Sequence, residues 1–437
     1  MAIISVMVGI FILPCVGGAL YYGEMAAARA FITSIILLVA PSIPIIFLFR
    51  NKNKAIISAR DGFLLVFFAW LSASICTAVP FYISDSVTTW GDAFFEAASG
   101  ISTTGATVIN DIEAAYKSIV LWRSIANWMG GMGIVVLSVA LMPLLGIGGM
   151  QLFRAEATGR DEGKLTPRIA QTAKILWVIY TCFTIISFVL LRFGGMTTFE
   201  AINHALTTMA SGGFSSKNNG MAHFQSPYIQ WVTMGIMFIS GLSFSLIYRL
   251  FTGKIKRVFM NTEIKAYIFI IIMSGLALTI INSVNGVFPD TATNIRMGYF
   301  HAVSMITSTG YATTDFTLWP ALSQYMLFIL MLVGGCAGST SGGLKVVRIV
   351  VMLKQALNEM RRLIYPHGVF VLRLNGAPMS DAFAHKVAGF FFLYTFSVLM
   401  VMFVVSSAGL DLFTSFTTGL AVIGNIGTGF GMIGPSY

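Results

Sequence analysis

The sequence predicts an all-α protein that crosses a membrane many times. Only 10% of its 437 residues are charged and 56% are hydrophobic, whereas soluble domains carry about 25% charged residues. Several apolar stretches, such as Phe63–Tyr82, reach the roughly 20 residues that a helix needs to cross a bilayer. These stretches are continuous rather than alternating, which excludes a transmembrane β-barrel.

The net charge of +10 is unevenly distributed, because most of the 27 lysines and arginines gather in alternate connections between the apolar stretches. An excess of basic residues marks the cytoplasmic side of a membrane protein. We therefore predict that the crowded connections are cytoplasmic and that the charge is not a nucleic-acid surface. The crowded connections hold Arg50, Lys52, Lys54 and Arg60; Arg154, Arg160, Lys164, Arg168 and Lys174; Arg249, Lys254, Lys256, Arg257 and Lys265; and Lys345, Arg348, Lys354, Arg361, Arg362, Arg373 and Lys386.

Two spans open the chain, near Ile3–Tyr22 and Ala30–Phe49, and form a first region over residues 1–60. A unit then recurs that consists of a long apolar helix, a shorter segment ending in Thr, Ser and Gly, and a second long helix. The first long helices are predicted near 62–82, 171–193, 264–284 and 385–408, and the second near 119–147, 226–251 and 321–353. The four units occupy residues 61–170, 171–262, 263–383 and 384–437.

The fourth unit has no second long helix before the sequence ends at Tyr437. Without that helix, backbone polar groups of the unit would face lipid, at several kcal/mol for each unsatisfied group. We therefore expect the native chain to continue for about one more span of roughly 20 residues.

The short segments of the four units align on Gly105, Gly213, Gly310 and Gly427. The residues eight and twelve positions before each glycine are small, and the residue four positions before it is apolar. This spacing predicts a helix of about ten residues, which is too short to span a bilayer. One such segment alone would be an ordinary turn between helices, but four at similar intervals indicate a repeated structure.

Four glycine-bearing stretches around one axis predict a cation site. Irregular backbone at membrane depth is tolerated where it lines a water-filled cavity, and its carbonyl oxygens can replace the hydration shell of a cation. Glycine permits the backbone angles that aim these carbonyls, and the negative C-terminal end of each short helix favours a cation. The stretches offer oxygen ligands and contain no Asp or Glu, which favours a monovalent cation over zinc, copper or a divalent ion. The added hydroxyls belong to Thr103, Thr104, Ser211, Ser308 and Thr309.

A glycine-rich segment, Gly334–Gly343, interrupts the second long helix of the third unit and is followed by Lys345 and Arg348. Each glycine costs a helix about 1 kcal/mol relative to alanine, so the segment is predicted to be a loop. Two interpretations stay open, a mobile gate beneath the cation site and close helix packing through small residues. The residues assigned to the gate are Gly334, Gly335, Gly338, Ser339, Thr340, Ser341, Gly342, Gly343, Lys345 and Arg348.

Several other polar residues accompany the short segments. Asp92, Glu96 and Glu200 are predicted to complement the positive N-termini of the short helices on the outer side. His204 and His301 share one position in the repeat, but the other repeats do not complete a metal-ligand set there. We therefore assign both histidines to packing or hydrogen bonding.

Several segments of the chain resemble the TrkH membrane subunits of bacterial Trk potassium uptake systems, a family related to the KtrB and HKT transporters. They are SGISTTGAT at 99–107, GGMGIVVLSVALMPLLGIGGMQLFRAE at 130–156, SGGFS at 211–215, TSTGYATTDF at 307–316 and GGCAGSTSGGLKVVRI at 334–349. The resemblance covers essentially the whole chain. It implies uptake of K⁺ through four M1–P–M2 repeats of the potassium-channel type around one pore, the fourth lacking its M2 in this chain. It implies K⁺ as the bound substrate ion and no organic cofactor.

The resemblance also implies site residues and partners. The two residues before each filter glycine would contribute carbonyls to bound K⁺, and related carriers of sodium often have Ser where this chain has Gly105. The family resemblance further implies a homodimer, a cytosolic TrkA-like regulatory subunit with nucleotide-binding RCK domains that gates the pore, and a location in the bacterial inner membrane. The implied filter residues are Thr103, Thr104, Gly105, Ser211, Gly212, Gly213, Ser308, Thr309, Gly310, Asn425, Ile426 and Gly427.

Two other classes of function remain as alternatives. A symporter of the alternating-access type, driven by sodium or protons, is typically built from inverted repeats and broken helices. The four repeats here share one polarity, which favours a pore. A membrane enzyme would need a nucleophile–base pair or a metal constellation. The sequence holds no HExxH motif and no paired carboxylates within the apolar stretches, so we predict that it is not an enzyme.

Overall fold

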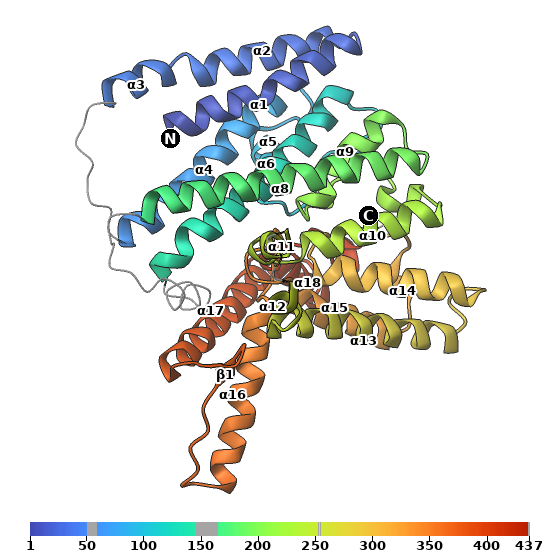
Figure 1. The fold of residues 1–437 in the computed structure, drawn as a ribbon. Coiled ribbons are helices and arrows are strands. Elements are labelled where there is room, and N and C mark those ends of the chain that lie inside the picture. Colours follow the sequence, from blue (N-terminus) through green and yellow to red (C-terminus); the bar gives the residue numbers. More distant parts are fainter. Residues whose placement is uncertain (50–58, 146–164, 252, 254, 436–437) are drawn as a thin grey trace.

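A computed structural model describes residues 1–49, 59–145, 165–251, 253 and 255–435, and nearly all of its regular structure is helical (Figure 1). Within the described residues, seven helices are long and apolar enough to cross a membrane, or eight if one bent pair counts as a single span. The predicted polytopic helical fold is confirmed. Parts of two basic connections that we predicted to be cytoplasmic, residues 50–58 and 146–164, lie outside the described residues.

The N-terminal region consists of α1 (Ala2–Tyr21), α2 (Met25–Val39) and α3 (Ser42–Phe49). Helices α2 and α3 together satisfy the length and hydropathy of one span, over 25–49, which begins five residues before the predicted start at Ala30. Helices α1 and α2 pack beside the first repeat. Their shared core contains Val8, Ile12, Phe31, Phe81 and Trp122.

In each repeat a long helix leads into a short one. The pairs are α4 (Ala59–Ile83) and α5 (Trp90–Ile101), α8 (Leu165–Phe193) and α9 (Thr198–Met209), α13 (Thr262–Val284) and α14 (Thr291–Ile306), and α17 (Asp381–Ser406) and α18 (Leu412–Ile423). The long helices agree with the predicted ranges to within a few residues. The short helices have 12 residues, except α14, which has 16.

The length of each short helix follows from where its N-cap lies. Thr89, Thr197, Asp290 and Asp411 precede the four helices, and each side chain accepts a hydrogen bond from a backbone N–H in the first turn. Such caps satisfy donors that the helix itself cannot bond. All four helices exceed the expected ten residues, and α14 is longer than the others because Asp290 lies about one turn further from its glycine than the other caps do.

The outgoing helix of each repeat differs from the others. In repeat 1, α6 (Lys117–Leu145) is continuous. In repeat 2 we predicted one helix over 226–251, and this was wrong. The structure has α10 (Pro227–Ser240) and α11 (Phe244–Phe251), bent by 97° at the break. In repeat 3, α15 (Ala321–Val333) and α16 (Val346–Ile364) are separated by the predicted loop.

The break in repeat 2 is stabilised by the loop of repeat 3. The backbone N–H of Cys336 donates to the carbonyl of Gly241 at 2.9 Å, and the N–H of Phe244 donates to the carbonyl of Gly338 at 3.1 Å. The loop therefore bonds backbone groups that a continuous helix would have bonded internally. A pattern read along repeat 2 alone could not reveal this, because the partner residues belong to another repeat.

The remaining elements are short. They are α12 (Ile255–Phe259), the 3₁₀ turns η2 (Gly220–His223), η3 (Phe316–Leu318) and η4 (Gly431–Ile433), and an antiparallel pair of strands, β1 (Arg373–Leu374) and β2 (Ala377–Pro378). Helix α16 projects from the body of the molecule, and β1 lies where α16 and α17 meet (Figure 1).

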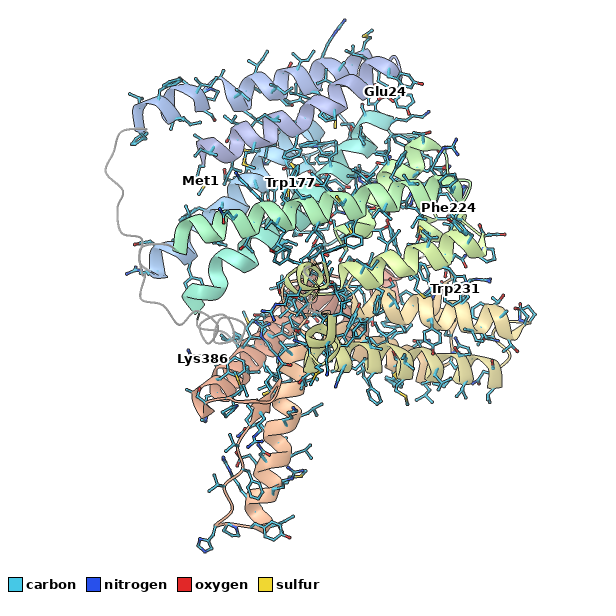
Figure 2. All side chains as sticks on the ribbon, in the orientation of Figure 1. Met1, Glu24, Trp177, Phe224, Trp231 and Lys386 are labelled. Atoms are coloured by element: carbon cyan, nitrogen blue, oxygen red, sulfur yellow. The ribbon has the colours of Figure 1, made fainter. Side chains whose placement is uncertain are left out.

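Large apolar side chains face outward as well as inward. Figure 2 shows side chains projecting all around the helical body, including those of Trp177 and Trp231. Phe67, Phe269 and Phe403 are among the exposed aromatic residues. In water such a surface would associate, whereas lipid tails solvate it, so the outer faces of these helices suit a bilayer.

Candidate functional site

The four short helices end in the same backbone motif. In repeat 1 the N–H of Thr103 bonds the carbonyl of Gly100 at 3.0 Å, and the N–H of Thr104 bonds the carbonyl of Ser99 at 2.9 Å. The same pair of bonds closes α9, α14 and α18. This is the Schellman arrangement, in which one residue after the helix adopts a left-handed conformation.

The left-handed position is not occupied by glycine in any repeat. Thr103, Ser211, Ser308 and Asn425 have φ of 64°, 56°, 52° and 59°. Left-handed backbone at residues other than glycine costs of order 1–3 kcal/mol and is concentrated at functional sites. Each of these residues belongs to the predicted set, so strained backbone recurs where the sequence placed the cation ligands.

The aligned glycines lie two residues further along and also have positive φ, at 82°, 71°, 74° and 85°. Each contacts the backbone of the next stretch so closely that an added Cβ atom would overlap a carbonyl oxygen. Gly105 lies against the carbonyl of Gly212, and Gly213 against that of Thr309. Gly310 lies against the carbonyl of Ile426, and Gly427 against that of Thr104. The contacts run from repeat 1 to 2, 2 to 3, 3 to 4 and 4 to 1. The four stretches therefore form a closed ring.

The ring brings the predicted site residues together and buries most of their side chains. Thr103, Ser211 and Thr309 are fully buried, and Ser308 and Ile426 are at most 2% exposed. The side chain of Asn425 extends across the boundary between repeats 4 and 1. Its Nδ2 donates to the carbonyls of Ser102 at 2.9 Å and Thr103 at 3.2 Å, while its Oδ1 accepts from Thr104 Oγ1 at 2.5 Å.

The other boundaries of the ring are held by different side chains. Between repeats 2 and 3, the hydroxyl of Tyr311 donates to the carbonyl of Phe214 at 3.0 Å and lies 2.7 Å from the hydroxyl of Thr207. Between repeats 3 and 4, Thr428 Oγ1 donates to the carbonyl of Gly310 at 3.1 Å. The backbone of the ring is thus repeated, whereas its side-chain support is not.

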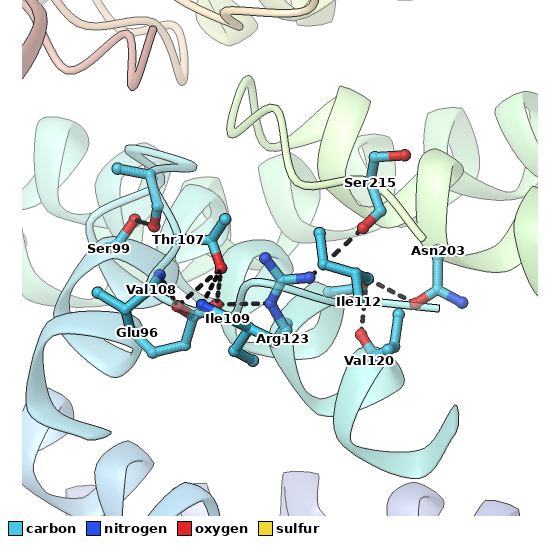
Figure 3. A network of polar contacts seen from close by, with 12 residues as sticks. Glu96, Ser99, Thr107, Val108, Ile109, Ile112, Val120, Arg123, Asn203 and Ser215 are labelled. Carbon is cyan, nitrogen blue, oxygen red and sulfur yellow. Dashed lines mark hydrogen bonds and ion pairs between the residues drawn. The ribbon is translucent and has the colours of Figure 1, made fainter. Parts of the chain in front are cut away.

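Between repeats 1 and 2 the support comes from Arg123 of α6, whose Nη1 donates to the carbonyl of Ser215 at 3.4 Å (Figure 3). Glu96 and Arg123 form a fully buried ion pair, with Arg123 Nε 2.5 Å from Glu96 Oε1. We predicted that Glu96 complements the N-terminus of α5, and this was wrong. Glu96 lies in the second turn of α5 and accepts hydrogen bonds from Thr107 and Val108. Arg123 was not identified as a site residue from the sequence, although a single charge within a span is a signal.

The remaining polar predictions agree with the structure. Asp92 and Glu200 lie in the first turns of α5 and α9, and Glu200 completes a capping box with Thr197. His204 and His301 are buried, and the Nδ1 of each lies 2.9 Å from a backbone carbonyl one turn earlier. No group of three His, Cys, Asp or Glu suited to a metal ion occurs within the described residues.

The predicted gate lies against the ring. Thr340 Oγ1 is 2.6 Å from Ser211 Oγ, and the N–H of Gly342 donates to Ser308 Oγ at 2.5 Å. A Cβ added to Gly342 would overlap the carbonyl of Gly424, immediately before Asn425. The loop therefore contacts three of the four stretches.

Three further residues fix the ends of the loop. The N–H of Ala337 donates to Glu263 Oε1 at 2.6 Å, Lys345 Nζ donates to the carbonyl of Ser341, and Arg348 Nη1 donates to the carbonyl of Leu344 at 3.0 Å. Lys345 and Arg348 were predicted members of this region, whereas Glu263 was missed. A charged residue at the start of an apolar span, as Glu263 is in α13, was the sequence feature that could have identified it.

Charged loops surround the outer side of repeats 1 and 2. Lys217 Nζ is 2.9 Å from Glu113 Oε1, and this hydrogen bond lowers the pKa of Glu113 and raises the pKa of Lys217. The side chain of Asn218 likewise lowers the pKa of Asp111 by hydrogen bonding. These carboxylates stay ionised at neutral pH, and exposed negative charge increases the local cation concentration.

Comparison with known proteins places the chain among transport proteins. The model of the TrkH family, described as cation transport protein, matches residues 27–436. The Trk system potassium uptake protein TrkH of Escherichia coli is 36% identical over 391 residues, which cover 89% of this chain and 81% of that protein. Its counterpart in Salmonella typhimurium is 34% identical over 432 residues, 98% of this chain and 89% of that protein. The crystal structure of the potassium transporter TrkH from Vibrio parahaemolyticus matches with a TM-score of 0.89 at 33% identity, over 99% of this chain and 90% of that chain.

Proposed function

The chain belongs to the TrkH family of cation transport proteins, and on that premise we propose that it takes up potassium ions through the ring of four glycine stretches. The family is one of transporters and not of enzymes. The chain is a multi-pass protein of the bacterial inner membrane. Its relatives are named as potassium uptake proteins, which supports K⁺ as the transported substrate.

The observation that carries this proposal is the closure of the ring. Each filter glycine lies against the carbonyl of the residue before the next glycine, so the backbone of four separate segments converges around one axis. In the proposed filter, carbonyls of Thr104, Gly212, Thr309 and Ile426 replace part of the hydration shell of K⁺. The residues before them, Thr103, Ser211, Ser308 and Asn425, complete the proposed set.

The short helices support a cation at this position. All four end at the ring, so the negative ends of their dipoles point toward it. In this proposal the residues 61–170, 171–262, 263–383 and 384–437 act as M1–P–M2 repeats, the short helices being the P segments. The first region, 1–60, adds the N-terminal spans.

The glycine-rich loop is proposed as the gate of this pathway. Its Thr340 and Gly342 bond the side chains of Ser211 and Ser308 directly, which supports a loop that closes the ring on one side in this proposal. A second copy of the chain and a cytosolic subunit with nucleotide-binding RCK domains are the proposed partners. The projecting helix α16, with Lys354, Arg361 and Arg362, offers a basic surface for the cytosolic partner.

Flux of ⁸⁶Rb⁺ into proteoliposomes that contain the purified protein tests the proposed function. We expect flux without an imposed sodium or proton gradient, inhibition by external K⁺, and much weaker inhibition by Na⁺. Flux that appears only with a sodium or proton gradient would favour the symporter instead. The absence of any Rb⁺ flux from folded protein, with its regulatory partner present, would contradict the proposal.

A further inference from the structure

The buried ion pair of Glu96 and Arg123 is unusual in its position. Both side chains are at most 1% exposed, and they lie within a membrane protein rather than in a water-filled cleft. Charges in such surroundings are costly unless they are paired, and they are commonly functional. Neither residue belongs to the ring itself, so the pair needs a separate explanation.

Each partner bonds a different stretch of the ring, as Figure 3 shows. The carboxylate of Glu96 accepts from Thr107 Oγ1 at 3.0 and 3.1 Å and from the N–H of Val108 at 3.0 Å, just beyond Gly105. Arg123 donates from Nη1 to the carbonyl of Ser215 at 3.4 Å, just beyond Gly213. Its guanidinium also lies 4.2 Å from the ring centre of Phe214. The pair thus connects the outer ends of two neighbouring stretches.

Helix α6, which carries Arg123, also contacts the second stretch at Gly212, before the filter glycine. Asn127 lies one turn after Arg123 in α6, is fully buried, and packs so closely on Gly212 that a Cβ there would overlap its amide. Within the described residues, neither amide atom of Asn127 has a hydrogen-bond partner. Helix α6 therefore contacts the second stretch at two points. Asn127 contacts the proposed ligand Gly212, and Arg123 contacts Ser215 beyond Gly213.

We propose that Glu96 and Arg123 are positioning residues that set the spacing of the first two filter stretches and thereby the discrimination between K⁺ and Na⁺. This inference rests on the proposed function. The pair does not touch the ion. It fixes the segments that carry the carbonyls, and discrimination between cations depends on how those carbonyls are held. Both carboxylate oxygens of Glu96 and the Nε and Nη1 of Arg123 are bonded, whereas Arg123 Nη2 has no hydrogen-bond partner within the described residues.

The variant that tests the inference is the double substitution Glu96→Gln with Arg123→Met. Removing both charges avoids the unpaired buried charge that either single substitution would leave. We expect the double variant to fold, to keep Rb⁺ flux, and to lose about tenfold in its K⁺-over-Na⁺ ratio, the size of effect seen when residues supporting a metal ligand are removed. We expect the single variant Arg123→Lys, which keeps the charge, to have a K⁺-over-Na⁺ ratio between those of the double variant and the wild type.

The matched control is Glu113→Gln with Lys217→Met. This ion pair connects repeats 1 and 2 at 2.9 Å through partly exposed loop side chains that do not contact the ring. Lys217 also pairs with Glu200 at 3.3 Å, so the control removes that contact as well. The control should keep the wild-type ratio. A folded Glu96→Gln/Arg123→Met protein with the wild-type ratio would overturn the inference. If that variant does not fold, a wild-type ratio in folded Arg123→Lys overturns it instead.

Gly105→Ser, measured in parallel, separates this inference from the proposed function. If Gly105→Ser lowers the ratio and the ion-pair variants do not, the filter stands and the positioning role is wrong. If none of the variants changes the ratio, the filter assignment itself is wrong, and the inference falls with it.

Discussion

The four glycine stretches of the ring and the glycine-rich loop both place glycines at positive φ, but the two regions are held in different ways. In the stretches, one left-handed residue and one glycine of positive φ recur in every repeat, and each glycine contacts its neighbour. In the loop, Gly334, Gly338 and Gly343 have φ of 74°, 76° and 72°, and among the described residues a glycine-rich loop of this kind occurs in repeat 3. Repeat 1 has an unbroken helix, α6, in the corresponding place.

The difference concerns how each region is held. The ring is held by backbone contacts that run through all four repeats, so moving one stretch disturbs its neighbours. The loop meets the ring chiefly through hydrogen bonds to the side chains of Ser211 and Ser308. Elsewhere it is bonded at Ala337 by Glu263, and its backbone bonds Gly241 and Phe244 at the break in repeat 2. We therefore expect changes in the ring to alter ion discrimination, and changes in the loop to alter flux while discrimination is preserved.

The largest effect is expected from Gly105→Ser. The residue has a φ of 82°, and its Cβ would overlap the carbonyl of Gly212. Backbone strain of about 1–3 kcal/mol corresponds to a loss of about tenfold in the K⁺-over-Na⁺ flux ratio. Competition of Na⁺ with ⁸⁶Rb⁺ uptake measures this ratio. Gly235→Ser, in open space on α10, is the control, and equal ratios in both variants would remove Gly105 from the filter.

Deletion of residues 338–342 should have the next largest effect. Loss of Thr340 and Gly342 removes the contacts with Ser211 and Ser308, so Rb⁺ flux should rise more than in either of the next two variants. The K⁺-over-Na⁺ ratio should stay unchanged. Close packing, the other interpretation of the segment, predicts little folded protein by size-exclusion chromatography. Folded protein with wild-type flux would exclude the gate.

Glu263→Gln should raise flux less than the deletion does. The glutamine can still accept from the N–H of Ala337, but a charged acceptor bonds more strongly than a neutral one. The difference of about 1 kcal/mol corresponds to about fivefold in the population of the displaced loop. Glu359→Gln, which removes an exposed ion pair with Arg362 on α16, should leave flux unchanged. A changed K⁺-over-Na⁺ ratio in Glu263→Gln would contradict the expectation that the loop affects flux and not discrimination.

Thr340→Val should give the smallest change. It removes the hydroxyl that meets Ser211, but Ser211 Oγ retains Ser240 Oγ at 3.1 Å. Thr340 Oγ1 also lies 3.2 Å from the carbonyl of Ser240 and 3.4 Å from that of Met209, and these contacts are lost too. A net loss at the weak end of the range for neutral hydrogen bonds, about 0.5 kcal/mol, predicts a rise in flux of about twofold. An altered K⁺-over-Na⁺ ratio, measured in the same vesicles, would mean that the loop supports the filter rather than only obstructing it.

Local patterns in the sequence predicted what each repeat contains. The spacing before Gly105 and its three counterparts identified the short helices, and the glycine content of 334–343 identified the loop. Features that depend on another repeat were missed. The bend after Ser240 requires Cys336 and Gly338, and the position of Glu96 makes sense only beside Arg123.

The left-handed positions were missed for a different reason. Thr103, Ser211 and Asn425 are residue types that are common in turns and loops. Their identity does not indicate a positive φ as strongly as glycine does. Their conformation follows from the Schellman bonds and from the closure of the ring. Closure is a property of four segments together, so no single segment reveals it.

The bend between α10 and α11 bears on the order in which the protein acquires its structure during synthesis. Repeat 2 leaves the ribosome before repeat 3, because chains are made from the N-terminus. The carbonyl of Gly241 and the N–H of Phe244 then exist before their partners Cys336 and Gly338 have been made. An unbonded backbone group in hydrocarbon costs several kcal/mol. We therefore expect repeat 2 to insert in a provisional form and to reach its final bend only after the loop of repeat 3 has entered the membrane beside it.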